Sequence, residues 1–430
     1  MKILIKNCTL ISMDNSREKI EYDMDILINN DRILKIGREI SNIGVDRVID
    51  ATGKVVLPGV INTHAHVPMS IFRETIDGLK LQEWLHDKIW PMEDKLTKED
   101  IFYASMLSFL EMIKSGCSTI NDMYFEADDI IKAKNILGIR LQTTRTLMSV
   151  NGADDGEKRI QELKELVEKY DSCDDTLTFN VAIHGLYTSD EEYVKKCIQV
   201  SKELNLPIHM HFCENEKEVA DIRTAYGRKP SDVLIENFAG YHTILAHCVK
   251  LGNEDLEKIK NLDIHVSTCP ISNLKLGCGI PKIAKMMELG INVSLGTDGQ
   301  GSGSNLDMFE AMKITALLQK GVEEDPTLLN SYDVLKMATI NGAKALGMED
   351  IIGSITENKK ADIIILNLDD AILKPTNDLV SEIVYNAKGT NVETTIVNGN
   401  ILMQNRVLTC NVNEKEIIEK CESIINRIRV

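Results

Sequence analysis

The chain has 430 residues, and 43% of them are hydrophobic, which allows a large core and two or three domains. Its 49 Lys and Arg residues are outnumbered by 66 Asp and Glu residues, giving a formal charge of −17, so nucleic acid and anionic membranes are poor candidates as partners. No run of about 18 uncharged apolar residues occurs, and the N-terminal stretch Met1–Lys6 is too charged for a signal peptide, so we expect a cytoplasmic protein without a membrane segment.

Both ends of the chain have the pattern of short β-strands. Alternating apolar segments such as 25–28 are separated by polar turns near the start, and 361–366 and 394–402 have the same texture near the end. We therefore expect residues 1–57 and 352–430 to form one small β-sandwich domain. A final helix is predicted at 413–428, where apolar residues recur at helical spacing, namely Ile417, Ile418, Cys421, Ile424, Ile425 and Ile428.

Between the two ends, apolar strand-like segments alternate with amphipathic helical segments. Eight candidate strands are centred on 60–61, 118–120, 141–143, 178–182, 207–211, 243–246, 264–266 and 293–295. Helices are predicted at 98–114, 155–170, 190–203 and 308–319. This alternation predicts an α/β fold, a (β/α)₈ TIM barrel over residues 58–351, although the pattern alone also allows a doubly wound open sheet.

The first barrel strand delivers two histidines, His64 and His66. Alternate residues of a strand point to the same face, so both imidazoles are expected to look into one cavity from the C-terminal end of the strand. Barrels of parallel strands carry their chemistry at that end. The spacing fits ligands for zinc or a related divalent metal, but a His-x-His pair alone fits two structural histidines equally well.

Later strands add matching side chains at their C-terminal ends. His211 is predicted as a further ligand, and His209, roughly 6–7 Å further back along the strand, as a core or supporting residue. Glu214 could carry protons from the following loop, or it could be a solvated acid. His247 ends the sixth strand and Asp298 the eighth, where an Asp often only caps a helix. Three imidazoles and one carboxylate from His64, His66, His211 and Asp298 suit a divalent ion with one position left for water.

The cysteines give no competing metal motif. Ten are present, and none falls in a Cys-x-x-Cys spacing, so a zinc ribbon and a redox motif both lack support. We expect buried free thiols in a reducing compartment.

Several motifs resemble those of a known enzyme family. They lie at residues 57–66, 83–85, 89–93, 207–214, 272–276 and 296–299. Together they cover nearly the whole chain and resemble the amidohydrolase superfamily, and within it the 5-methylthioadenosine/S-adenosylhomocysteine deaminases. The first and last motifs fit many amidohydrolases, whereas Trp90-Pro91-Met92-Glu93 is more selective.

This resemblance implies a site and an activity. It implies one zinc ion, or Fe²⁺ or Mn²⁺, held by His64, His66, His211 and Asp298. It implies catalytic roles for Glu214, His247 and Asp298. It also implies substrate-binding roles for Glu93, Trp90, Arg145, Arg159, His184 and Glu214. Of these, Arg159 aligns only loosely with its counterpart in the family. The expected reaction is hydrolytic deamination of 5′-modified adenosines, in which a zinc-bound hydroxide attacks C6 and releases ammonia. The expected substrates are 5′-methylthioadenosine, S-adenosylhomocysteine, 5′-deoxyadenosine and adenosine, and a homo-oligomer is also expected.

Two stretches depart from the family pattern and leave alternatives open. Residues 183–188 read Ile-His-Gly-Leu-Tyr-Thr and residues 268–271 read Thr-Cys-Pro-Ile, so the pocket wall near the base can differ from that of relatives. There are two alternatives. One is a related amidohydrolase that acts on guanine, cytosine or a chlorotriazine, and the other is a non-catalytic metal-binding barrel. The cytidine-deaminase fold is excluded because its Pro-Cys-x-x-Cys zinc signature is absent.

Overall fold

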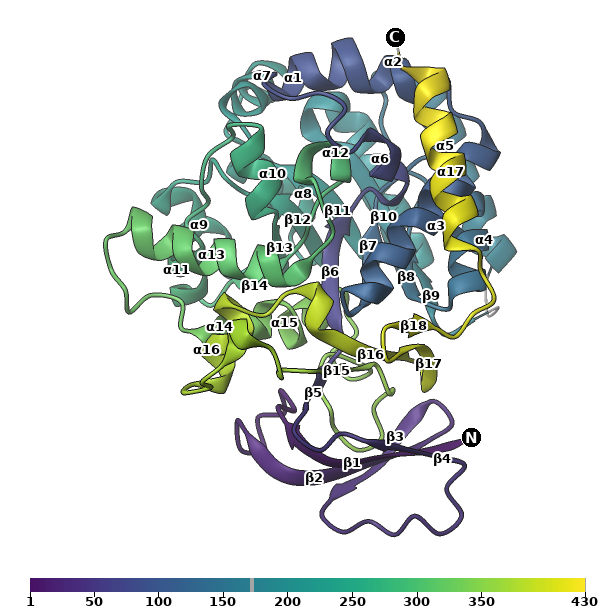
Figure 1. The fold of residues 1–430 in the computed structure, drawn as a ribbon. Helices are drawn as coiled ribbons and strands as arrows, with labels where there is room; N and C mark the ends of the chain where they lie inside the picture. Colours follow the sequence, from purple (N-terminus) through teal and green to yellow (C-terminus); the bar gives the residue numbers. More distant parts are fainter. Residues whose placement is uncertain (171–173, 430) are drawn as a thin grey trace.

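The computed structural model describes residues 1–170 and 174–429, and its centre is a closed barrel of parallel strands (Figure 1). In the described part, the wall consists of β6 (Val60–Ala65), β7 (Cys117–Asp122), β8 (Arg140–Thr143), β9 (Leu177–Phe179), β10 (Val181–Gly185), β11 (Ile208–Phe212), β12 (Thr243–His247), β13 (Ile264–Thr268) and β14 (Asn292–Leu295). The sheet is parallel from β6 to β9 and from β10 to β14.

Two joints close this wall into a barrel. The predicted strand 178–182 is split into β9 and β10, and at the split the Asn180 amide donates to the Thr143 carbonyl at 3.1 Å. On the other side, the Asp298 amide donates to the His64 carbonyl at 2.9 Å, which brings the end of β14 against β6. The predicted (β/α)₈ barrel is therefore confirmed, and the alternative of a doubly wound open sheet is not.

Helices surround the barrel and match the predicted ones closely. They include α3 (Lys98–Lys114), α4 (Ala127–Leu137), α5 (Ala153–Tyr170), α6 (Glu191–Leu204), α7 (Glu216–Tyr226), α8 (Pro230–Phe238), α9 (Asn253–Ile259), α11 (Ile283–Glu288), α13 (Met308–Val322), α14 (Ser331–Met337) and α15 (Ile340–Ala345). The start of α3 is fixed by a capping box, in which Thr97 and Asp100 each accept a hydrogen bond from the other's backbone amide.

The two chain ends form one β-rich region beneath the barrel (Figure 1). Its strands are β1 (Lys2–Leu10), β2 (Glu21–Asn29), β3 (Arg32–Gly37), β4 (Arg47–Asp50), β5 (Val55–Pro58), β15 (Ile363–Leu366), β16 (Val392–Val397), β17 (Asn400–Gln404) and β18 (Val407–Leu408). In the described residues they make a single nine-stranded sheet, and β5 joins its halves by pairing with β1 and β15. Side chains of both halves, such as Ile5, Ile26 and Ile365, share one buried cluster.

The last helix, α17 (Glu414–Ile428), returns to pack on α3 of the barrel. Of the apolar residues at helical spacing it buries Ile417, Cys421, Ile424 and Ile428, whereas Ile418 is 44% exposed, so the buried stripe is narrower than the apolar pattern. Shorter elements after the barrel are η4 (Ala371–Leu373), α16 (Leu379–Tyr385) and η5 (Gly389–Asn391).

The described cysteines are all free thiols, as expected, and Cys173 lies outside the described residues. Among the helices in the described part, none is long and apolar enough to cross a membrane.

The barrel is joined to the terminal sheet through Gly59 and a buried ion pair. The Gly59 amide donates to the Asp362 carbonyl at 2.9 Å, and a Cβ at Gly59 would lie 2.3 Å from the Ser118 hydroxyl, so only glycine fits there. The Arg140 guanidinium donates to both carboxylate oxygens of Asp362 at 2.8 and 3.1 Å, and the Asn398 amide donates to the same carboxylate at 2.7 Å. Both charged side chains are only 2% exposed.

This ion pair yields a prediction about stability. The substitution Arg140→Met leaves the Asp362 carboxylate buried without its counter-charge, so we expect the free energy of unfolding to fall by about 3–5 kcal/mol in urea titrations. The double variant Arg140→Met/Asp362→Asn should recover part of that loss because no charge then remains buried. As a control, Lys217→Ala at the exposed pair with Asp221 should cost less than about 1 kcal/mol. Equal stability of the single and double variants would contradict this account.

Candidate active site

Three imidazoles and one carboxylate meet at the C-terminal end of the barrel. His64 and His66 come from the end of β6 and its following residue, His211 comes from β11, and Asp298 follows β14. The Nε2 atoms of His66 and His211 are 3.3 Å apart. The Asp298 Oδ1 atom lies 3.1 Å from His66 Nε2 and 3.6 Å from His64 Nε2. All four predicted ligands are thus brought to one point.

The opposite edge of each imidazole is fixed by a hydrogen bond. The Nδ1–H of His66 donates to the Met123 carbonyl, and that of His211 donates to the His184 carbonyl, both at 2.6 Å. These bonds place a proton on Nδ1 and leave an Nε2 lone pair facing the shared point. His64 differs, because its Nδ1 lies 2.9 Å from Nε2 of the buried His209, which gives that residue the supporting place predicted for it.

Asp298 is held by three donors. The hydroxyls of Ser272 and Ser302 donate to its Oδ2 at 2.6 and 2.9 Å, and the Gly299 amide donates to its Oδ1 at 2.8 Å. Oδ1 also faces the histidines. Burial raises the pKa of Asp298, but the neighbouring imidazoles of His64 and His66 outweigh it and hold the pKa well below its usual range. The carboxylate is therefore ionised and correctly aimed to bind a cation.

The spacing of these atoms fits a tetrahedral metal ion. Zn–N bonds of about 2.0–2.1 Å place neighbouring ligand atoms about 3.3–3.4 Å apart, close to the distances of 3.1, 3.3 and 3.6 Å found here. The Nε2 atom of His64 is buried and has no hydrogen-bond partner among the described residues, as expected of an atom reserved for a metal. Burial lowers the pKa of His66, but the contact with Asp298 outweighs it and raises the pKa to about 9, so a metal ion that bound here would displace a proton from Nε2.

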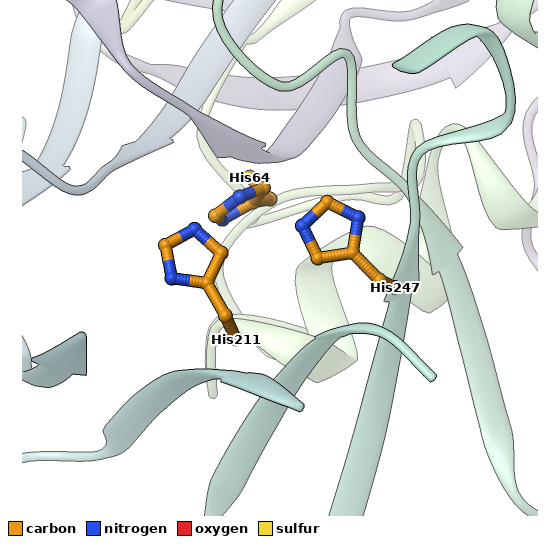
Figure 2. A group of neighbouring side chains, drawn as sticks. All are labelled: His64, His211 and His247. Carbon is orange, nitrogen blue, oxygen red and sulfur yellow. The ribbon is translucent and has the colours of Figure 1, made fainter. Parts of the chain in front are cut away.

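His247, at the end of β12, lies beside this group. Its ring stacks on that of His211 with centroids 5.5 Å apart, and Figure 2 shows the rings of His64, His211 and His247 turned toward one another. These three also have ligand atoms close enough to hold a metal ion. The Nδ1–H of His247 donates to the Asn273 side-chain carbonyl at 2.9 Å, so its Nε2 lone pair is directed toward the site.

Glu214 occupies the wall next to His247. One of its carboxyl oxygens lies 3.9 Å from His247 Nε2, and the other is 3.7 Å from the Cys278 thiol, which donates to it. Burial raises the pKa of Glu214, and the charge of Asp298 adds to the effect while His247 opposes it. The buried Glu218 accepts the backbone amides of Cys213 and Glu214 at 2.8 and 2.7 Å, which fixes the turn that carries Glu214.

A cavity of about 60 Å³ opens above these residues. Its roof is the segment 81–93, which folds as α1 (Leu81–Trp84), the π-helical turn η2 (Leu85–Ile89) and α2 (Trp90–Glu93). The remaining short elements around the cavity are η1 (Val67–Phe72), η3 (Leu186–Thr188), α10 (Pro270–Lys275) and α12 (Gln300–Gly303). Trp90 and His184 both line it, with ring centroids 6.4 Å apart.

Glu93 stands where this inner cavity meets a wider outer one of about 440 Å³. Its carboxylate accepts a hydrogen bond of 2.6 Å from the Tyr124 phenol. Burial raises the pKa of Glu93 to about 7, although that hydrogen bond and the charge of His66 lower it. Glu93 and Tyr124 line both cavities, so any ligand that spans them passes this pair.

Arg145 and Arg159 line the outer cavity and do not approach the ligand cluster. Both guanidinium groups lie over the ring of Phe125, at 5.8 and 5.7 Å from its centroid. Arg145 pairs with Glu162 and Arg159 with Asp155. The Nη1 atom of Arg159 is buried and has no partner among the described residues, which leaves a donor for an anionic group.

Four supporting residues received no role from the sequence. These residues act through contacts between segments that are distant in the chain, and no sequence spacing predicts such contacts. They are Tyr124, Ser302, Glu218 and Cys278. Ser272 lies in a motif that was noted, but its bond to Asp298 depends on how α10 packs against the end of β14.

Comparison with known proteins agrees with this geometry. The Amidohydrolase family matches residues 55–402. The chain is 39% identical to the 5-methylthioadenosine/S-adenosylhomocysteine deaminase of Thermoanaerobacter pseudethanolicus, over 94% of each chain. It is 40% identical to the 5′-deoxyadenosine deaminase of Methanosarcina acetivorans, over 98% of this chain and 97% of the relative.

A solved structure shows the same fold. The crystal structure of an adenosine deaminase from Xanthomonas campestris with bound zinc superposes with a TM-score of 0.94 and 26% identity, over 99% of this chain and 98% of that one. The barrel, the convergent histidines and these relatives lead to one conclusion: the chain belongs to the amidohydrolase family, in the group that contains the 5-methylthioadenosine/S-adenosylhomocysteine and 5′-deoxyadenosine deaminases.

Proposed function

We propose that the protein is a metal-dependent deaminase of adenosines modified at the 5′ position, converting them to inosine-type products and ammonia. The observation that carries this proposal is that the cavity beside the histidine cluster and the arginine-lined outer cavity adjoin and share Glu93 and Tyr124 in their walls. A purine with a ribose and a 5′ substituent has these three parts in this order. The names of the relatives support the same substrate class.

The metal is proposed to be held by His64, His66, His211 and Asp298. Zinc suits this set of three imidazoles and one carboxylate, and Fe²⁺ or Mn²⁺ are the alternatives. When bound, such an ion acidifies a coordinated water and so makes a nucleophile available near neutral pH. The residues around it would then orient the purine and move its protons.

Glu214 is proposed to act as the proton donor to the purine ring. Its raised pKa favours the protonated form, which can donate to N1 as the nucleophile adds at C6. Asp298, ionised and next to the nucleophile, can take a proton and deliver it to the departing amine, because an amide anion cannot leave unassisted. His247 presents an Nε2 lone pair to the same space and would orient the nucleophile.

The ribose and base are proposed to be held by the walls of the inner cavity. The Glu93 carboxylate can accept hydrogen bonds from the two vicinal hydroxyls of a ribose. Trp90 and His184, which both line this cavity with their rings edge-on to each other, would contact the purine.

The outer cavity is proposed to take the 5′ substituent. The Nη1 atom of Arg159 has no partner among the described residues, and Arg145 lies over the same Phe125 ring, so the cavity offers a charged hydrogen-bond donor. A carboxylate on the 5′ substituent would accept from this donor, whereas a thioether would gain little from it. This favours S-adenosylhomocysteine, whose substituent ends in an amino-acid carboxylate, among the substrates. A free base or a chlorotriazine would leave Glu93 and both arginines without a ligand, so that alternative has less support.

A substrate panel tests the proposed function. Metal-loaded protein should release ammonia and reduce adenine absorbance with 5′-methylthioadenosine, S-adenosylhomocysteine or 5′-deoxyadenosine, because each carries the base, ribose and 5′ group that the two cavities fit. Guanine, cytosine and atrazine serve as comparison substrates. Turnover of those compounds, with no turnover of any nucleoside, would overturn the proposal.

Glu214→Gln should separate proton transfer from metal binding. Gln keeps the shape of the side chain but cannot donate an acidic proton, so we expect kcat to fall by about 10²–10⁴-fold. Metal content, measured by atomic emission, should stay at the wild-type level because Glu214 is outside the proposed ligand set. An active Glu214→Gln variant would remove the role assigned to this residue.

Arg159→Gln should distinguish substrates by the charge of the 5′ substituent. Loss of charged hydrogen bonds, worth roughly 1.5–3 kcal/mol, should raise KM for S-adenosylhomocysteine about tenfold or more. KM for 5′-methylthioadenosine, which has no carboxylate, should change far less. Arg228→Gln is a matched control, because that guanidinium pairs with Glu191 and Glu236 and does not line either cavity. Equal effects of Arg159→Gln on both substrates would exclude a carboxylate contact.

A further inference from the structure

The geometry points to Tyr124 as a positioning residue that aims the Glu93 carboxylate at the ribose and thereby sets the preference for ribonucleosides over 2′-deoxynucleosides. The inference rests on the proposed function, in which Glu93 accepts hydrogen bonds from the ribose hydroxyls. Tyr124 is only 4% exposed, and its phenol donates to Glu93 Oε1 at 2.6 Å. In the described part of the chain, no other hydrogen bond to that carboxyl group is present.

Among the described residues, the roof segment packs into the core through residues such as Ile89 and Met92 but donates no hydrogen bond to the Glu93 carboxylate. Glu93 is the last residue of α2, the short helix that follows the π-helical turn η2, so its backbone is not part of the barrel wall. The carboxylate therefore depends on Tyr124 for its direction.

Tyr124, in contrast, is tied firmly to the barrel. It follows β7 by two residues, and its carbonyl accepts both the amide and the hydroxyl of Thr146, at 3.0 and 2.8 Å. The preceding residue, Met123, donates its amide to the Ala65 carbonyl and accepts the His66 imidazole with its own carbonyl. The phenol that holds Glu93 is thus one residue away from the carbonyl that orients a predicted metal ligand.

The chemistry of the pair suits this role. Burial, reinforced by the nearby Glu93 charge, raises the pKa of Tyr124 well above its usual range, so the phenol keeps its proton and remains a donor. A short hydrogen bond to one oxygen favours the ionised form of a buried carboxylate. An ionised Glu93 can accept from both ribose hydroxyls, whereas a protonated one loses acceptor capacity.

A double-mutant cycle tests whether Tyr124 acts through Glu93. The variants are Tyr124→Phe, Glu93→Ala and the combination, assayed with 5′-deoxyadenosine and 2′,5′-dideoxyadenosine, which differ only in the 2′-hydroxyl. The measured quantity is the ratio of kcat/KM for the two nucleosides. Metal content and thermal unfolding are measured in parallel, and Glu93→Gln replaces Glu93→Ala if the latter does not fold.

We expect Tyr124→Phe to reduce the ribo/deoxy ratio about tenfold, the effect of one weakened hydrogen bond to a charged group. Glu93→Ala should bring the ratio close to one, and adding Tyr124→Phe to it should change nothing further, because the two residues form one unit. Tyr226→Phe is the matched control: its buried phenol donates to the Ser189 and Leu186 carbonyls, outside both cavities. Its ratio should stay at the wild-type value.

Two results would overturn the inference. One is a wild-type ratio in Tyr124→Phe, and the other is an effect of Tyr124→Phe that persists unchanged when Glu93 is absent. If the wild-type protein turns over neither nucleoside, the proposed function itself is wrong and the role of Tyr124 falls with it.

Discussion

The structure depends on bringing together, at the C-terminal end of the barrel, the four largely buried side chains that we propose as metal ligands. Lone pairs of His64, His66 and His211 and a carboxylate oxygen of Asp298 face each other at 3.1 to 3.6 Å. Such an arrangement leaves the buried Nε2 atom of His64 without a hydrogen-bond partner among the described residues, which costs about 1–3 kcal/mol unless a cation binds there. The barrel sustains it because each ligand is held from behind, by a carbonyl, a second imidazole or serine hydroxyls.

The backbone that presents these groups is itself unusual. Cys213, His247 and Asp298 all have positive φ values, 51°, 72° and 64°, at the ends of three barrel strands. Left-handed backbone is unfavourable for residues with a side chain and persists only where the surroundings enforce it. Here Glu218 holds the turn at Cys213, and Asp298 is bound by Ser272, Ser302 and Gly299. At the other end of the barrel, the ion pair between Arg140 and Asp362 joins the barrel to the terminal sheet.

The sequence predicted those parts of the site that follow strand periodicity. His64, His66 and His211 could be found because alternate residues of a strand share a face, and Asp298 because it follows an apolar strand at the same end of the barrel. Glu93 and the two arginines came only from family resemblance, since nothing in their local pattern indicates a ligand. The split between β9 and β10 was not predicted because both halves are equally strand-like, and helical spacing alone does not show that Ile418 lies outside the buried stripe of α17.

What the sequence could not reveal is how one short turn coordinates separate parts of the site. Within Asp122–Phe125, Met123 orients His66, Tyr124 holds Glu93, and the Phe125 ring carries both arginines. Asp122 anchors this turn by accepting the Val67 amide at 2.7 Å. Because these four residues are consecutive, the contacts that hold His66, Glu93 and the two arginines all start from one short segment, so a change in this turn would affect all of them. In the proposed function, this one short element therefore supports the residues assigned to the metal, to the ribose and to the 5′ substituent.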